Sequence, residues 1–299
     1  MDQIGEPTNE RPILRCPVCH EGLLRVTGAY ACRNLHSFDV AKEGYLNVLL
    51  AHQKASRTPG DSLAMIRNRQ QFLASGYFAP LAARIAAIVD ESRSERGAER
   101  QCNLLDAGCG EGYYLRQLRG LGDARLTGPS LALWGLDISK EAVRLAARRD
   151  QVARYLVASV HSLPFLDGSL DYILQVFAPT NADELTRVLR PDGEVLIVRP
   201  GPDHLAGLKQ ILFEQSRPHP DETEPVRGFE PIATERLSYD IQLPDPGTIE
   251  ALLGMTPCYW TSGRSGRERL IGVDRLATPV DFSLTRYRRR LLASPSLPY

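Results

Sequence analysis

Short apolar runs alternate with helical patterns from residue 102 to about residue 200. The runs are short enough to be β-strands, and turn or cap residues separate them from the segments that follow. The predicted strands are 103–107, 132–137, 154–160, 171–179 and 194–200, and the predicted helices are 113–118, 140–149 and 182–193. Because apolar strands that alternate with helices form parallel sheets, we expect a parallel sheet covered on both faces.

Further elements are predicted on either side of this alternating region. Residues 61–76 have the pattern of a helix that is capped by Asp61 or Ser62 and ended by Gly76, and residues 77–91 that of a second helix. The charged residues 91–101 are predicted to be a loop. Beyond residue 205 we expect mostly helix and a proline-rich stretch, then antiparallel strands at 235–243 and 280–289 around a helix at 246–255.

The stretch from residue 102 to residue 118 combines a strand, a glycine-rich turn and a helix start. Its turn contains Gly108, Gly110 and Gly112. Glycines let the backbone approach a ligand closely, and a helix N-terminus offers free N–H groups to it. This is the first β-turn-α unit of a nucleotide-type fold.

Acidic residues in this unit narrow the class of ligand that it can bind. Asp106 precedes the first glycine, Glu111 lies inside the turn, and the spacing is not that of dinucleotide-binding proteins. Such acids would repel a pyrophosphate but suit an ammonium or a sulfonium group. The next predicted strand ends in Asp137, where a carboxylate can accept both hydroxyls of an adenosine ribose. These features resemble class I S-adenosylmethionine-dependent methyltransferases; the alternative is a glycine-rich turn of another α/β enzyme.

Three of the six cysteines lie in the first 32 residues, with a histidine after them. Cys16, Cys19, Cys32 and His36 form a C-x2-C, twelve residues, C-x3-H pattern around a predicted β-hairpin with its turn at residues 27–28. Three thiolates and one imidazole form a closed, structural zinc site. His20 is an alternative ligand, although it is adjacent to Cys19 and poorly placed. The other alternative is free cysteines packed as small apolar residues.

Charge and composition limit the partners. The formal net charge is zero, there is no apolar run near the length of a membrane span, and the start is polar and acidic, so we expect a cytoplasmic protein. Residues 11–89, however, contain ten Lys/Arg and four Asp/Glu, and residues 285–292 are also basic. Either region could contact phosphates, and solvated surfaces are the alternative for each.

The zinc pattern together with the glycine turn resembles the bacterial large-subunit ribosomal RNA (guanine-N1)-methyltransferases. The matching strings include CPVCHEGL, RTPGDSLAMIRNRQQFLASGYF, DAGCGEGYY, GLDISK, VFAP and PGPDHL, and they cover roughly residues 14–210. The resemblance implies a Rossmann-like α/β domain with a mostly parallel seven-stranded sheet and a small N-terminal zinc ribbon. It divides the chain into residues 1–37 (tail and ribbon), 38–100 (helical and basic-loop connector) and 101–299 (methyltransferase domain).

The resemblance also implies site residues. The family's zinc ligands correspond to the four predicted above, and its S-adenosylmethionine contacts correspond to Gly110, Glu111 and His204. A family tyrosine corresponds to Phe78, so its hydroxyl is absent here unless Tyr77 replaces it. From the strand pattern, Asp106, Gly108, Gly112 and Asp137 are further cofactor residues, and the adenine is expected near Ser159. The alternative for Ser159 is a turn-capping hydroxyl.

The implied reaction methylates N1 of a guanine in a hairpin of 23S rRNA. That atom carries a proton and lies on the Watson–Crick edge, so the base must be unpaired or flipped out. We expect Phe177 to stack on the base and the backbone near Ala178 and Pro179 to read its edge; a plain core aromatic is the alternative. Asp61 and His161 are candidate proton acceptors.

The RNA backbone is expected to bind the ribbon and the basic loop with Lys54 and Arg57. A homodimer would help to hold a hairpin. Two other functions compete with this one: a methyltransferase for a quinone or another metabolite, and a non-catalytic zinc-ribbon RNA-binding protein.

Overall fold

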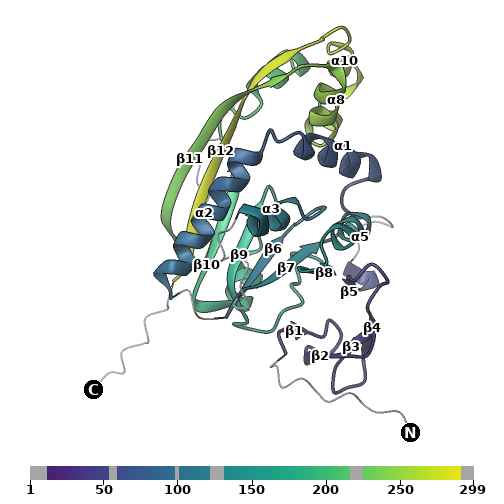
Figure 1. Cartoon of the computed structure of the whole chain (residues 1–299), viewed down its shortest axis with the longest axis vertical. Helices are drawn as coiled ribbons and strands as arrows, with labels where there is room; N and C mark the ends of the chain where they lie inside the picture. The colour runs from purple at the N-terminus through teal and green to yellow at the C-terminus, as the bar shows by residue number, and fades with distance from the viewer. Residues whose placement is uncertain (1–11, 54–58, 98–100, 122–130, 216–224, 291–299) are drawn as a thin grey trace.

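One mixed sheet of eight strands organises the computed structural model, which describes residues 12–53, 59–97, 101–121, 131–215 and 225–290. The strand order is β11-β12-β10-β9-β6-β7-β8-β5 (Figure 1). Only β12 runs against the other seven, since its pairings with β10 and β11 are antiparallel and all the others are parallel. The strands are β5 (Leu46–Asn47), β6 (Cys102–Ala107), β7 (Leu131–Asp137), β8 (Arg154–Val157), β9 (Leu170–Val176), β10 (Leu189–Pro200), β11 (Phe229–Leu243) and β12 (Leu276–Arg289).

The seven predicted strands are all present, which confirms the expected class of fold. The eighth strand, β5, comes from the segment between the ribbon and the first long helix, and it pairs with the edge strand β8. The last two strands are longer than predicted because they pair with each other from Phe229↔Arg289 to Leu243↔Leu276. A two-residue strand and the extended ends of two paired strands depend on their partners, so local patterns do not reveal them.

The helices pack mainly on one face of the sheet. They are α1 (Leu63–Ala74), α2 (Ala79–Glu95), α3 (Tyr113–Leu121), α5 (Lys140–Arg149), α6 (Ala182–Val188), α7 (Ala206–Leu212), α8 (Pro246–Gly254), α9 (Cys258–Thr261) and α10 (Gly263–Glu268), and a 3-10 turn covers Ala51–Gln53. Alternate residues of β6 separate the two cores: Leu104 belongs to the cluster with α2, α3, α5 and α7, whereas Leu105 belongs to the cluster with α6 and the zinc ribbon. The ribbon therefore occupies space on the second face that further helices were expected to cover.

Two helix ends differ from prediction. The helix α2 continues through residues 91–95, which were predicted as loop, because Ser92 is buried and its hydroxyl donates to Glu194 over 2.8 Å. The helix α6 ends at Val188 rather than near Gly193, because Leu189 already pairs with Leu170 of β9. In both places a tertiary partner overrides the local pattern.

The ribbon is a separate four-stranded antiparallel sheet at the end of the molecule opposite α8 (Figure 1). Its strands are β1 (Leu14–Arg15), β2 (Gly22–Val26), β3 (Ala29–Ala31) and β4 (Ser37–Asp39). Among the described helices, no single one has both the length and the apolar composition to cross a membrane; only α1 and α2 taken together, with an 83° bend between them, pass that test.

Candidate active site and metal centre

The glycine turn after β6 lies between the tips of β7 and β9. The amides of Gly108 and Cys109 both donate to the carbonyl of Leu136, over 2.8 and 2.9 Å. Gly108 has a φ of +98°, and a Cβ at this position would lie 2.6 Å from the Cβ of Ala178. Only glycine is therefore compatible with both the dihedral and the close approach. Gly112 instead packs against Tyr155, whose hydroxyl would lie 2.7 Å from an added Cβ.

Asp137 is at the tip of β7 and holds two backbone amides. One oxygen accepts from Gly110 over 2.9 Å, and the other accepts from Ser139 over 2.8 Å. Burial raises the pKa of Asp137, and these two hydrogen bonds oppose that rise. Each carboxylate oxygen has a second lone pair, so the group can still accept two hydroxyls, as a ribose requires.

Asp106 has no hydrogen-bond partner for either carboxylate oxygen within the described residues, although it is only 1% exposed. Burial, and to a lesser degree the charge of Asp137, raises its pKa from 3.8 to about 8. A buried carboxylate without a donor is costly, and a cationic ligand would relieve that cost. The glycine cradle, Asp137 and this unpartnered carboxylate together suit the ribose and the ammonium group of S-adenosylmethionine.

Glu111 has a different environment from the one that its place in the turn suggested. Its carboxylate is 2% exposed and accepts from Arg116 of α3 over 2.8 and 3.0 Å and from Arg149 of α5 over 3.0 Å. These ion pairs fix the start of α3 against α5. The carbonyl of Glu111 also accepts from Arg116 over 2.6 Å, so a contact between Glu111 and a cofactor would use its backbone amide.

The segment before α1 packs against the residues between β7 and α5. Gly60 packs on Ser139, which would lie 2.9 Å from an added Cβ, and the Ser139 hydroxyl donates to the carbonyl of Asp61 over 3.3 Å. The carboxylate of Asp61 is in an ion pair with Arg69 of α1. Ser62, not Asp61, caps the helix, accepting from the amide of Met65 over 3.3 Å. Asp61 is therefore engaged by an arginine rather than free to accept a proton.

Phe78, Phe177, His204 and Phe282 belong to an aromatic cluster that also includes Phe72, Tyr77 and Tyr239. The rings of His204 and Phe282 are 5.0 Å apart, Phe78 lies 5.1 Å from Phe282, and Phe177 lies 5.8 Å from His204. Phe78 is 2% exposed and His204 8% exposed. The amide of Asp281 donates to His204 Nδ1 over 3.2 Å, which fixes the orientation of this imidazole.

Phe177 is the exposed member of this cluster. It is 45% exposed and has a φ of +54°, a left-handed conformation that is costly for a bulky side chain. The next residue, Ala178, is the one that contacts Gly108. Strained residues of this kind concentrate at functional sites, because the surrounding structure must hold them in place.

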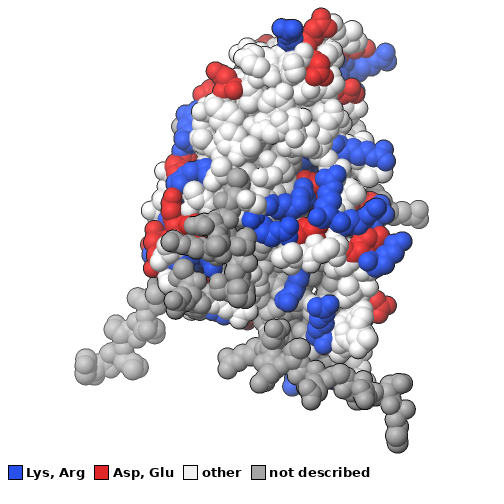
Figure 2. Space-filling model, in the orientation of Figure 1, with Lys and Arg blue, Asp and Glu red and all other residues white. Residues whose placement is uncertain are grey.

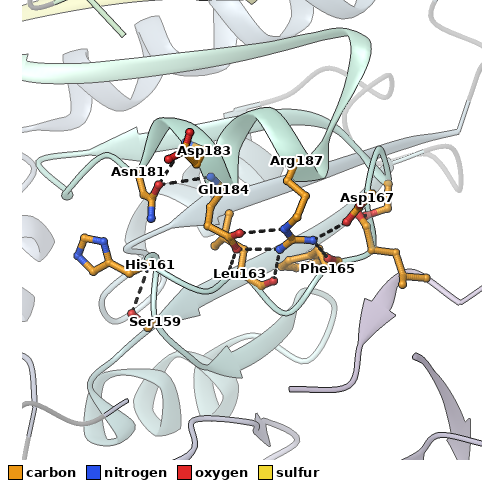
Figure 3. Close-up of polar contacts among 11 residues, drawn as sticks. Ser159, His161, Leu163, Phe165, Asp167, Asn181, Asp183, Glu184 and Arg187 are labelled. Atoms are coloured by element: carbon orange, nitrogen blue, oxygen red, sulfur yellow. Dashed lines mark hydrogen bonds and ion pairs between the residues drawn. The ribbon is translucent and has the colours of Figure 1, made fainter. Parts of the chain in front are cut away.

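Ser159 and His161 lie in the loop that follows β8 (Figure 3). The Ser159 hydroxyl accepts from the amide of His161 over 3.2 Å, so it does cap a local turn, and it is 7% exposed. Further along this loop, Arg187 of α6 donates to the carbonyls of Leu163 and Phe165 over 2.8 and 2.7 Å. In Figure 3 the ring of His161 extends away from this arginine, on the side of the loop near the start of α6.

The ribbon brings together the four predicted zinc ligands. The ligand atoms of Cys16, Cys19, Cys32 and His36 all lie within 4.8 Å of one another. Local backbone bonds hold the two pairs: the amide of His20 donates to the carbonyl of Cys16 over 2.9 Å, and that of Cys32 to the carbonyl of His36 over 3.0 Å. His20 is exposed and outside this group. Three sulfur atoms and one nitrogen are the donor set of a structural zinc ion.

Main-chain hydrogen bonds attach the ribbon to the loop after β8. The amide of Arg15 donates to the carbonyl of Pro164 over 3.0 Å, and the amide of Leu166 donates to the carbonyl of Ile13 over 2.9 Å. Leu14 and Phe165, at 1% and 0% exposure, pack in the same core cluster. The metal centre and the sheet therefore share one hydrophobic core.

Comparison with known proteins gives this arrangement a context. Residues 14–57 match the family model described as RlmA, N-terminal, and residues 105–197 match a methyltransferase domain. The 23S rRNA (guanine(748)-N(1))-methyltransferase of Streptomyces fradiae is 35% identical, with 91% of this chain and 96% of that protein covered. YxjB of Bacillus subtilis (strain 168), provisionally described as a 23S rRNA (guanine-N1)-methyltransferase, is 33% identical over 84% of this chain and 88% of its own.

Similarity to metabolite methyltransferases is shorter. The demethylmenaquinone methyltransferase of Thermotoga maritima is 33% identical over only 31% of this chain and 38% of its own. The relatives that match nearly the whole chain are the ribosomal RNA enzymes, and the ribbon with its metal ligands is included in that match. The chain therefore belongs to the family of zinc-containing, S-adenosylmethionine-dependent 23S rRNA (guanine-N1)-methyltransferases.

Proposed function

We propose that this protein transfers a methyl group from S-adenosylmethionine to N1 of a guanine in a hairpin of 23S rRNA. S-adenosylmethionine supplies, when bound, an electrophilic methyl group on a sulfonium. The residues that would hold it are Asp137 at the ribose, Asp106 at the ammonium, the backbone of the glycine turn, and Ser159 near the adenine. Phe78 and His204 would form the wall on the opposite side, with His204 oriented by Asp281.

One observation carries the assignment of the methyl-accepting side. Ala178 packs against Gly108 of the cofactor turn, so the strained, half-exposed ring of Phe177 stands beside the place proposed for the cofactor. An aromatic ring at this point can stack on an unpaired guanine and direct its edge towards the methyl group. Positioning of this kind supplies much of the rate of a group transfer.

The proton on N1 must leave before or during transfer. Of the two side chains considered for this task, Asp61 is held in an ion pair with Arg69, whereas His161 is exposed on the loop beside Ser159. We therefore favour His161. Its exposed imidazole can pass the proton to solvent.

We propose that the ribbon is the main RNA-binding surface. The basic loop residues Lys54 and Arg57 lie outside the described residues. The basic C-terminal strand is a weaker candidate, because Arg286 and Arg288 are both paired with the buried Glu194. Figure 2 shows Lys and Arg gathered at mid-height of one face. Four arginines of α3 and α5 are in ion pairs: Arg116 and Arg149 with the buried Glu111, Arg119 with the buried Asp150, and Arg144 with the partly exposed Glu141. These pairs reduce the field that the four arginines offer to RNA.

The deciding experiment measures transfer of tritium from labelled S-adenosylmethionine to unmodified large-subunit RNA and, separately, to a metabolite extract. Labelled RNA with a single modified guanine supports the proposal, and mapping the product identifies which guanine it is. Label in the metabolite fraction supports the small-molecule alternative, and no transfer with intact RNA binding supports the non-catalytic one. We further propose that the protein acts in the cytoplasm and that two copies hold the hairpin, which sedimentation with and without RNA tests.

A further inference from the structure

Arg69 of α1 approaches the glycine turn from the connector. Its Nη1 lies 3.6 Å from the position that a Cβ would take at Gly110. The same nitrogen is in the ion pair with Asp61, and Nη2 is 3.5 Å from the carbonyl of Met255. These contacts fix the guanidinium on two sides, while its fork of five N–H donors leaves some for a ligand.

Tyr114 follows the glycine turn, in the first turn of α3. Its hydroxyl is buried and has no hydrogen-bond partner in the described part of the chain. Burial raises the pKa of Tyr114, the negative charge of Asp106 raises it further, and the positive charge of Arg69 lowers it. The carboxylate of Asp106 and the phenol of Tyr114 both lack hydrogen-bond partners within the residues described.

The other arginines near the turn are paired with a buried acid. Arg116 and Arg149 both donate to the buried carboxylate of Glu111, on the side of α3 and α5. Arg69 by contrast is paired with Asp61, whose side chain is 26% exposed. Arg69 is therefore the arginine best placed to add an anionic ligand to its contacts.

We propose that Arg69 and the Tyr114 hydroxyl bind the α-carboxylate of the amino-acid end of S-adenosylmethionine. This inference rests on the proposed function, in which Asp106 accepts the ammonium. The ammonium and the carboxylate are attached to the same carbon, so the groups that bind them must be neighbours. Asp106 precedes the glycine turn, Arg69 approaches Gly110 within it, and Tyr114 follows it in the first turn of α3, so one short segment of chain gathers two donors for the carboxylate and one acceptor for the ammonium.

The test compares ligands that do and do not carry the carboxylate. Calorimetry on the full chain would measure the binding of S-adenosylhomocysteine, its decarboxylated analogue and 5'-methylthioadenosine, which lacks the whole amino-acid end. Arg69→Met should weaken S-adenosylhomocysteine about 10- to 100-fold, the range for a charged hydrogen-bonded contact, and leave methylthioadenosine within about twofold. Tyr114→Phe should act in the same direction by a smaller factor. Arg67→Met, an exposed arginine of the same helix, is the matched control.

The outcomes separate the possible failures. If Arg69→Met weakens all three ligands equally, Arg69 supports the fold and the inference is wrong; a thermal melt would show the same. If the unaltered protein binds S-adenosylhomocysteine no better than its decarboxylated analogue, the inference is also wrong, and this result needs no variant. If the unaltered protein binds none of the three, the proposed function fails as well.

Discussion

The amide of Gly110 donates to the carboxylate of Asp137 over 2.9 Å, which joins the turn after β6 to the tip of β7. The other Asp137 oxygen holds the amide of Ser139, the N-cap residue of α5. One side chain therefore positions both the glycine turn and the start of the next helix. The ribose proposed to bind here would meet an acceptor whose orientation is already fixed before binding.

Replacing Asp137 should abolish this arrangement. Asp137→Ala removes the ribose acceptor and leaves two amides without their partner, so we expect affinity for S-adenosylhomocysteine to fall by about 10- to 100-fold. Calorimetry measures the change, and a thermal melt follows the fold. Asp167→Ala, which removes a mostly exposed carboxylate, is the control and should bind normally. Unchanged affinity in Asp137→Ala would rule out the ribose assignment.

Loss of the Phe177 ring should lower activity without lowering stability. Phe177→Gly relieves a left-handed conformation that costs a bulky residue about 1–2 kcal/mol, and loses the stacking surface, worth about 1–3 kcal/mol per base. We expect kcat/KM for RNA to fall by roughly 10- to 100-fold while the melting temperature stays the same or rises. Phe177→Trp should retain activity. A variant that loses stability and activity together would identify Phe177 as a core residue instead.

The unpartnered carboxyl group of Asp106 predicts that the stability of the folded protein depends on pH. Its pKa is raised from 3.8 to about 8 in the folded protein, so between these values the folded state binds a proton that the unfolded state has released. Stability without cofactor should therefore fall as the pH rises from about 4 to about 8, and this contribution should level off above. Denaturant unfolding across this range measures it.

Asp106→Asn is the comparison for that measurement, since it keeps the shape and removes the titration. The variant should show a flatter pH profile and weaker binding of S-adenosylhomocysteine. Binding to the unaltered protein should also release protons near neutral pH, because an ammonium favours the charged carboxylate; calorimetry in buffers of different ionisation enthalpy detects this. Identical profiles for the two proteins would contradict the assignment.

Metal removal should unfold the ribbon. A module of this size has little core of its own, and zinc supplies roughly 10 kcal/mol or more of folding free energy to such sites. We expect Cys16→Ser and His36→Asn to lose bound zinc and RNA affinity. His20→Asn should keep both, because His20 lies outside the ligand group and asparagine tolerates its φ of +67°. Zinc content by mass spectrometry and RNA binding by gel shift are the readouts.

Local sequence was sufficient where a feature is encoded by neighbouring residues. The strand ends at Ala107 and Asp137, the Ser139 cap and the four zinc ligands were all predicted, since each depends on residue types at short spacing. The fold class and the family followed from the same strings.

Features that depend on distant residues could not be predicted in this way. Arg69 meets Gly110 from 41 positions earlier in the chain, and nothing in the helical pattern of α1 distinguishes it from Arg67. The carboxylate of Glu111 was expected at the cofactor, but two arginines from α3 and α5 take it. The strain at Phe177 is a property of backbone geometry and has no sequence signal of its own.

The contacts that attach the ribbon to the sheet place few limits on the outward side chains of the ribbon. Two of its hydrogen bonds are between main-chain atoms, from Arg15 to Pro164 and from Leu166 to Ile13, and any residue except proline can supply such a donor. The apolar contacts of the shared core, to which Leu14, Leu23 and Phe165 belong, restrict side-chain type. The outward side chains of the ribbon can therefore change, and with them the RNA preference of the interface proposed there, while the module stays fixed against the same methyltransferase domain.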